Sequence, residues 1–200
     1  MNKVLLRNFS LKHLFQSLTF FTALIVPTFA YSDLPTQYFP ANRFDRFYFV
    51  WYTMFLVSLE EPSLIADKTD NETIRFPWLR SFHNPVAVRV EIEPDGRAQL
   101  FLKVTGGAGG YDAGPLVTNL NKSLTEFEVQ RVLEATKFMS ACRQPPTEAM
   151  FDGAQWIMER KTKIGYCVID QQSPTEGNMY KAGVLLLGLA GYEASPEDIY

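Results

Sequence analysis

His83 is the one imidazole that we expect in the mature protein, because the other histidine, His13, lies in a leader that we expect to be removed. A Ser-His-Asp hydrolase could be built on His83, but the sequence has no G-x-S-x-G turn to present a nucleophilic serine. Metal ligation would need further ligands, and no H-E-x-x-H spacing accompanies this histidine. We interpret His83 as an edge residue just before a strand and as a candidate partner contact, and we expect no metal and no cofactor.

The cysteines Cys142 and Cys167 are the only two in the chain. One pair cannot fill a zinc site, and their spacing is not that of a redox C-x-x-C motif. In an oxidising compartment such a pair usually forms a disulfide, and closing this loop stabilises the fold by about 3 kcal/mol. We therefore predict a disulfide, which removes both thiols as nucleophiles.

The glycine-rich stretch from Thr105 to Gly114, TGGAGGYDAG, could suggest a nucleotide loop. A phosphate-binding P-loop needs Lys and then Ser or Thr after its last glycine, and a dinucleotide loop needs glycines at the first, third and sixth positions before a helix. This stretch meets neither requirement. We interpret it as a flexible connection whose tip, Tyr111 and Asp112, could contact a partner.

Neighbouring carboxylates could supply an acid and a base, as in glycosidases. Three such pairs have structural explanations instead: a helix end, a solvated strand face, and a helix N-terminus where negative charge is favourable. They are Glu60 with Glu61, Glu91 with Glu93, and Glu126 with Glu128. An acid and base assembled only by the fold stays open.

Residues 1–30 have the order of regions that an export signal requires. Three cations precede an apolar run from Leu14 to Val26, and small residues stand at Thr28 and Ala30. The run is about a dozen residues, whereas a membrane-spanning helix needs about 20. We predict cleavage near Tyr31, with an uncleaved anchor as the alternative, and therefore a periplasmic or secreted protein without a stable membrane span.

Loss of the leader makes the chain more acidic. The chain has 19 Lys and Arg against 22 Asp and Glu, and the leader holds three of the cations and none of the acids, so 16 basic residues face 22 acidic ones afterwards. A net charge of −6 repels nucleic-acid phosphates and favours encounter with a basic protein. We expect a protein partner and no nucleic acid.

The elements that must position these residues follow from hydrophobic spacing. Residues 31–43 suggest an extended arm, 66–75 a polar loop, and 194–200 a polar tail. Apolar recurrence at helical spacing predicts a helix over 44–59, one that opens at Ser123 or Thr125 as a capping box and ends before Cys142, and one over 178–189. Alternation predicts strands over 86–92, 100–104, 116–120, 154–159 and 166–170.

Hairpins dominate this order, and strands and helices do not alternate regularly. We therefore predict residues 31–200 to be a single α+β domain, with an antiparallel sheet built from hairpins and helices packed on one face. An apolar content of 46% and an aromatic content of 14% suffice for one core.

Several stretches in the C-terminal third of the chain resemble a known group of proteins. The stretches DGAQW (152–156), GYCVID (165–170), SPTEG (173–177) and VLLLGLAG (184–191) resemble the C-terminal signature of small, uncharacterised exported bacterial proteins. The resemblance implies an exported bacterial origin and no particular activity.

Three functions are compatible with these observations. The first is a non-enzymatic exported binding protein, of the type of an inhibitor or immunity protein that blocks a toxin or cell-wall hydrolase. The second is an envelope or cell-wall hydrolase whose site is assembled from scattered residues, which would show a polar cleft with converging titratable groups. The third is an accessory subunit of an envelope complex, which would show a large exposed apolar patch.

Overall fold

The computed structural model describes residues 38–144 and 152–200. The predicted signal peptide, residues 1–30, lies outside the described residues, as do residues 31–37 of the predicted arm. Within the described part, none of the helices combines the length and apolar character that crossing a membrane requires.

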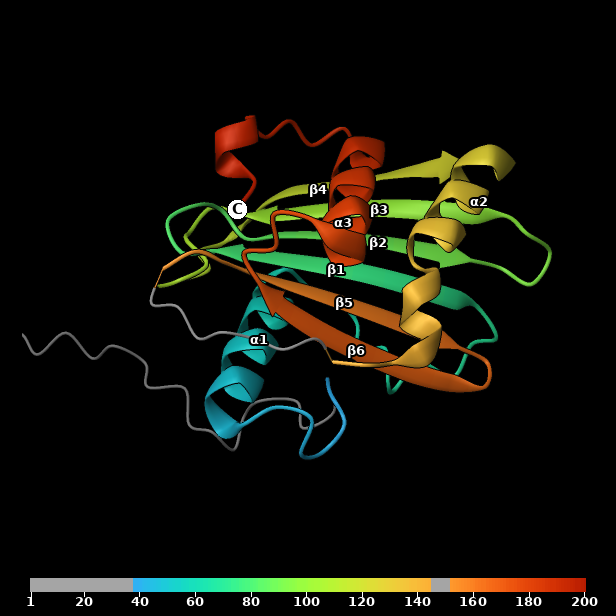
Figure 1. The fold of residues 1–200 in the computed structure, drawn as a ribbon, viewed down its shortest axis with the longest axis horizontal. Helices are drawn as coiled ribbons and strands as arrows, with labels where there is room; N and C mark the ends of the chain where they lie inside the picture. The colour runs from blue at the N-terminus through green and yellow to red at the C-terminus, as the bar shows by residue number, and fades with distance from the viewer. Residues whose placement is uncertain (1–37, 145–151) are drawn as a thin grey trace, which may run out of the picture. The chain divides into compact units, whose positions relative to one another are not determined.

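The chain forms a six-stranded sheet in the order β4-β3-β2-β1-β5-β6, with every neighbouring pair antiparallel (Figure 1). The elements in chain order are α1 (Arg46–Ser58), β1 (Glu72–Arg80), β2 (Val86–Ile92), β3 (Ala98–Thr105), β4 (Leu116–Leu124), α2 (Glu126–Ala135), the 3₁₀ helix η2 (Lys137–Ala141), β5 (Ala154–Thr162), β6 (Gly165–Gln172), α3 (Gly177–Ala190) and the 3₁₀ helix η3 (Pro196–Asp198). The predicted single α+β domain with an antiparallel sheet is confirmed.

Local signals in the sequence explain where the helices begin and end. The Asp45 carboxylate accepts a hydrogen bond from the Tyr48 amide at 3.0 Å and so caps α1. Of the two predicted starts of α2, the one at Thr125 is confirmed, because Thr125 and Glu128 form a reciprocal capping box. Helix α3 ends at Gly191, whose φ of 69° is left-handed and favours glycine.

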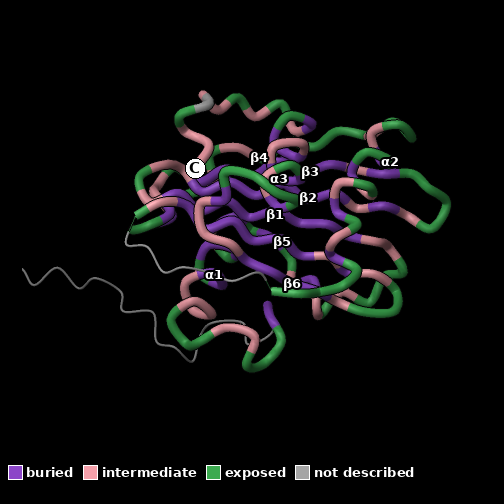
Figure 2. Tube along the Cα trace, viewed as in Figure 1, coloured by how far each residue is buried: buried purple, intermediate pink, exposed green. Residues whose placement is uncertain are grey.

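Helices α2 and α3 pack on one face of the sheet, and α1 packs on the other (Figures 1 and 2). The larger core, under α2 and α3, contains Phe76, Trp78 and Trp156. The smaller core, under α1, joins Tyr52 and Phe55 to apolar residues of β1, β5 and β6. The sheet is therefore a middle layer whose central strands are covered on both faces.

Strand β1 corrects the sequence prediction, which placed a polar loop over 66–75 and no strand after it. Arg75 makes the segment look solvated, but this residue is fully buried in an ion-pair network. Pro77 also argues against a central strand, because proline cannot donate to the ladder. The pairing of β1 with β5 skips Phe76 and Pro77, which is how the sheet accommodates the missing N–H.

Gly183 lets α3 approach the sheet closely. A Cβ atom at this position would overlap the Trp156 ring and lie 2.8 Å from Phe76 Cζ. We expect Gly183→Ala to lower the free energy of unfolding by about 1–3 kcal/mol through overpacking. Gly188 is the matched control, because a Cβ atom there meets nothing within 4 Å.

In chemical denaturation, Gly188→Ala should instead raise stability by about 1 kcal/mol or less, because alanine favours a helix over glycine. Equal losses in both variants would contradict the close-approach explanation.

The predicted disulfide is confirmed: Cys142 and Cys167 are bonded, with their Cα atoms 5.6 Å apart. It joins the residue after η2 to strand β6. Nearby, the Gln144 side chain donates to the Asp170 carbonyl oxygen at 2.6 Å and accepts from the Asp170 amide at 3.2 Å. The end of the α2–η2 segment is thus attached to β6 by both covalent and polar contacts.

Candidate partner-binding surface

The three residues that the sequence singled out for partner contact lie at one end of the sheet. His83 belongs to the connection between β1 and β2, while Tyr111 and Asp112 belong to the loop between β3 and β4. Both connections leave the same end, because the strands between them alternate in direction. The structure therefore brings together residues that are about 28 positions apart in the chain.

Hydrogen bonds join the two connections along their backbones. The Gly109 amide donates to the His83 carbonyl and the Gly110 amide to the Ser81 carbonyl, each at 3.1 Å. The Asn84 side chain donates to the Thr105 carbonyl at 2.8 Å. The Trp51 indole of α1 donates to the Gly109 carbonyl at 3.0 Å. The loop is consequently attached both to the sheet end and to α1.

The glycines of this loop are needed for close backbone approach. A Cβ atom at Gly109 would lie 2.5 Å from the Arg80 carbonyl oxygen, and one at Gly110 would lie 2.9 Å from the Ser81 carbonyl oxygen. These distances are shorter than van der Waals contact. The interpretation of the stretch as a flexible connection is therefore replaced by a hydrogen-bonded loop that packs tightly on its neighbour.

Phe82 and Tyr111 form an exposed aromatic pair on these loops. Their exposed fractions are 59% and 72%, and their ring centroids are 6.1 Å apart. The sequence reasoning singled out Tyr111 but missed Phe82. The available signal was an aromatic residue between Ser81 and the strand-opening Asn84–Pro85, where neither a helical nor an alternating pattern assigns it to a core.

His83 is held by residues near the end of the sequence. Its Nδ1 lies 3.0 Å from the Tyr200 hydroxyl, and its Nε2 lies 3.3 Å from Asp198 Oδ1. Ser195 Oγ donates to Asp198 Oδ2 at 2.7 Å, so the serine contacts the carboxylate and not the imidazole. This is not the order of contacts in a Ser-His-Asp triad, in which the histidine stands between the other two residues.

Residues 194–200, predicted as a polar tail, pack partly against the apolar core. The Tyr200 carbonyl oxygen accepts hydrogen bonds from the indole nitrogens of Trp156 at 2.8 Å and Trp78 at 3.4 Å. Ile199 and Tyr200 also pack against the larger core. These contacts fix the residues around η3 next to His83.

Several carboxylates belong to the same loops as the aromatic pair or to segments that contact these loops. Asp112 and Glu197 are exposed, and Asp198 is partly exposed beside His83. Asp152 is exposed in the turn whose Gly153 carbonyl accepts from the Ser81 amide at 2.9 Å. We call Phe82, His83, Tyr111, Asp112, Asp152 and Asp198 the aromatic-acidic surface. This surface combines exposed aromatic rings with negative charge.

A second group of ionisable residues is buried under the segment that follows α1. Arg75 lies 2.5 Å from Glu159 and 3.4 Å from Glu61, while Arg89 lies 2.9 Å from Glu61 and Lys103 lies 3.5 Å from it. The sequence indicated a helix end at Glu61 but did not predict this network. Residues 59–71 cover this face of the sheet, and the side chains of Glu61 and Arg89 are buried beneath them.

The network holds the 59–71 segment on the sheet. The Arg75 guanidinium donates to the Pro62 carbonyl and the Lys103 ammonium to the Glu60 carbonyl, each at 2.5 Å. Burial alone would lower the pKa of Arg75, but the neighbouring Glu159 carboxylate outweighs it, and the pKa lies above its usual range. With side chains at most 9% exposed, these five residues cannot meet a substrate, and we assign them a structural role.

Two carboxyl groups make the stability depend on pH in opposite directions. Burial raises the pKa of Asp170, although a hydrogen bond from Tyr52 acts against it. Burial also opposes ionisation of Asp67, but hydrogen bonds from Thr69 and Lys161 outweigh it and place that pKa below its ordinary value. The pKa of an Asp in an unfolded chain is about 3.9. The folded state therefore binds the Asp170 proton more tightly, and the Asp67 proton less tightly, than the unfolded chain does.

We expect wild type to gain stability relative to Asp170→Asn as the pH falls from neutral towards about 4, because protonation of Asp170 then removes the cost of a buried charge. Wild type should lose stability relative to Asp67→Asn as the pH falls below about 4, because protonation removes the ion pair with Lys161. Urea unfolding between neutral pH and about pH 3 measures both differences. Parallel pH profiles for the two variants would contradict these assignments.

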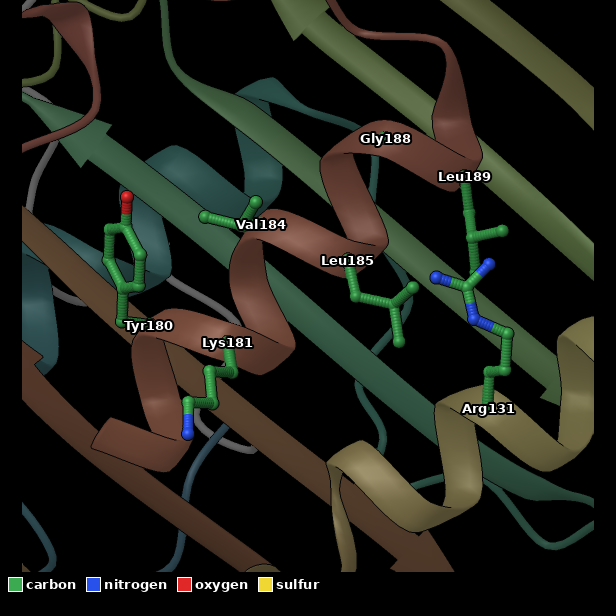
Figure 3. Close-up of a pocket in the computed structure, with 7 residues that line it drawn as sticks. All are labelled: Arg131, Tyr180, Lys181, Val184, Leu185, Gly188 and Leu189. Atoms are coloured by element: carbon green, nitrogen blue, oxygen red, sulfur yellow. The ribbon is translucent and has the colours of Figure 1, made fainter. Parts of the chain in front are cut away.

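A separate groove lies between α2 and α3 (Figure 3). It is open, has a volume of about 500 Å³, and its lining is mainly apolar, with Val184, Leu185 and Leu189 on α3. Arg131 of α2 and Lys181 of α3 stand at its rim. The lining contains no carboxylate, imidazole or thiol, so the groove offers mainly apolar contact and positive charge.

In residues 38–144 and 152–200, no group of three or more His, Cys, Asp or Glu side chains could hold a metal ion. The described residues thus form a disulfide-bonded α+β domain with an exposed aromatic-acidic surface. No protein-family model and no curated protein matches the sequence. The resemblance of residues 152–191 to small exported bacterial proteins stays a prediction.

Proposed function

We propose that this chain is an exported, non-enzymatic binding protein that uses the aromatic-acidic surface to engage a basic protein. An inhibitor or immunity protein that blocks a toxin or a cell-wall hydrolase is the type that fits best. The observation that carries the proposal is the exposed pair of Phe82 and Tyr111 on two loops that are hydrogen-bonded to each other.

The rigidity of the loops supports a binding role. Fixing a contact loop before association reduces the conformational entropy lost on binding. Tyrosine offers a large contact area with few rotatable bonds, and it is enriched among the residues that dominate binding energy. The Gly109 and Gly110 backbone hydrogen bonds and the Trp51 indole hold Tyr111 in place in this way.

Charge supports a basic partner. The acidic side chains around the pair would attract a cationic surface and speed its association, an effect that salt reduces. The expected net charge of the processed chain has the same sign. Export itself rests on the predicted leader, and the Cys142–Cys167 disulfide is compatible with an oxidising compartment.

The alternative hydrolase needs accessible, converging titratable groups. The cluster around Arg75 and Glu61 converges, but its side chains are buried. His83 is accessible, but its two nitrogens contact Tyr200 and Asp198. These geometries favour binding over catalysis as the role of the described residues.

Tyr111→Ala should weaken partner binding by about 30-fold or more, the effect of removing a residue that dominates an interface. Phe127→Ala is the matched control, because Phe127 on α2 has the same exposed fraction of 72% and lies outside the surface. The immobilised chain is exposed to periplasmic extract, and to extracellular proteins of competing cells. Wild type and Phe127→Ala should recover the same protein in stoichiometric amount.

Capture should also fall as salt is raised, because the acidic rim contributes. Equal capture by Tyr111→Ala and wild type, or repeated failure of wild type to capture any protein, would contradict the proposal.

A further inference from the structure

The outer face of α1 carries an apolar stripe. It consists of Phe47, Val50, Met54 and Val57. Phe47, Met54 and Val57 are 69%, 45% and 41% exposed, and Val50 is partly exposed. The opposite face of the same helix, with Tyr52, Phe55 and Leu56, is buried against the sheet.

A surface helix normally presents polar residues on the face away from the core. Helix α1 is apolar on both faces, and no described segment of the chain covers its outer one. Figure 1 shows α1 as the one described helix on its side of the sheet, with α2 and α3 on the other side. Exposed apolar patches of this kind mark interaction sites.

The spacing of the stripe residues is the same when it is read from either end of the helix. The steps between its residues are three, four and three positions, the pattern of paired helices that pack side chains into one another's gaps. When a second copy runs antiparallel, Phe47 of one helix faces Val57 of the other, and Val50 faces Met54. Each apolar residue thus meets an apolar residue, as a two-fold contact requires.

One exposed charged residue at each end of the helix is complementary to the other in the same arrangement. Arg46 opens α1 and Glu60 follows its end, and both are exposed. An antiparallel pair places each arginine near the glutamate of the other copy and also opposes the helix dipoles favourably. Arg46 has a contact within its own chain, but a guanidinium has five N–H donors and can serve a second acceptor.

We infer that the outer face of α1 is a two-fold interface between two copies of this chain. Trp51 connects this interface to the aromatic-acidic surface, since its ring lies 5.8 Å from Phe47 and its indole binds Gly109. The dimer therefore presents two partner-binding surfaces, one from each copy. Bivalent partners would bind such a dimer more tightly than a single chain.

The test is the oligomeric state of the purified, processed chain. Sedimentation equilibrium over a range of concentrations measures it. Wild type should sediment as a dimer. Met54→Glu should raise the dissociation constant of the dimer by about 100-fold or more, because two carboxylates then face apolar side chains beside the two-fold axis. Ile164→Glu is the control, since Ile164 is 97% exposed in the β5–β6 turn, and it should stay dimeric.

A charge exchange makes the inference specific to an antiparallel pair of copies. Arg46→Glu and Glu60→Arg should each weaken the dimer, and the double variant should restore it. Circular dichroism checks that every variant is folded. Capture of the basic partner by Met54→Glu is a separate readout, so failure of the dimer and failure of the proposed function can be distinguished.

A monomeric wild type would overturn the inference. A Met54→Glu variant that dimerises as well as wild type would also overturn it, because the contact between the copies would then lie elsewhere. If the monomer binds phospholipid vesicles, or a different protein, through the stripe, the second copy is replaced by that occupant and the inference is wrong.

Discussion

Replacing Arg75 with methionine should lower the free energy of unfolding by about 3–5 kcal/mol, the usual effect of removing one partner of a buried ion pair. The guanidinium is completely buried between Glu159 and Glu61, and it also donates to the Pro62 carbonyl. Without it, Glu159 keeps a hydrogen bond from Tyr166 at 2.6 Å but loses its only counterion among the ion pairs of the described residues. Urea denaturation followed by tryptophan fluorescence measures the loss.

Arg97→Met is the control for this variant. Arg97 also contacts two carboxylates, those of Asp95 and Glu93, but its side chain is 73% exposed. Solvated pairs contribute little, so we expect no measurable change in stability. If Arg75→Met loses no more stability than Arg97→Met, the buried network does not hold the 59–71 segment as we describe.

The second large effect should come from the disulfide. Replacing both Cys142 and Cys167 with serine should lower the free energy of unfolding by about 3 kcal/mol, mainly because the unfolded chain gains freedom. The crosslink spans a sequence separation of 25 residues. The same urea titration measures it, and folding at lower temperature keeps the variant testable if it is marginal.

Wild type treated with a reductant is the comparison for the serine variant. Both should lose the same stability if the crosslink and not the serine side chains causes the change. The reductant can reach the disulfide from the side of Cys142, which is exposed, whereas Cys167 is buried. A reduced wild type as stable as the oxidised protein would contradict a stabilising role.

Most of the fold could be predicted because its elements have regular local patterns. The alternation from Val86 to Ile92 gave β2, and the capping box at Thr125 gave the start of α2. Strand β1 could not be predicted in this way. Its Arg75 and Pro77 both argue against a buried strand, and only the long-range partner Glu159 and a gap in the β5 ladder make the strand possible.

The candidate surface was predictable in part. Tyr111, Asp112 and His83 could be singled out as polar or aromatic residues in connections, but their proximity depends on strand order, which the sequence did not reveal. The close packing of Gly109 and Gly110 looked like flexibility for the same reason. The apolar spacing over 44–59 predicts the helix, but only the structure shows which face of α1 is covered and which apolar residues stay exposed.

A hydrogen-exchange footprint of the complex with the captured partner tests the central claim most directly. We predict that the partner slows exchange of amides in residues 81–84 and 106–114, the loops that carry Phe82 and Tyr111. The groove between α2 and α3 should be unaffected. Protection confined to that groove, with unchanged exchange in the two loops, would contradict our assignment of the contact surface.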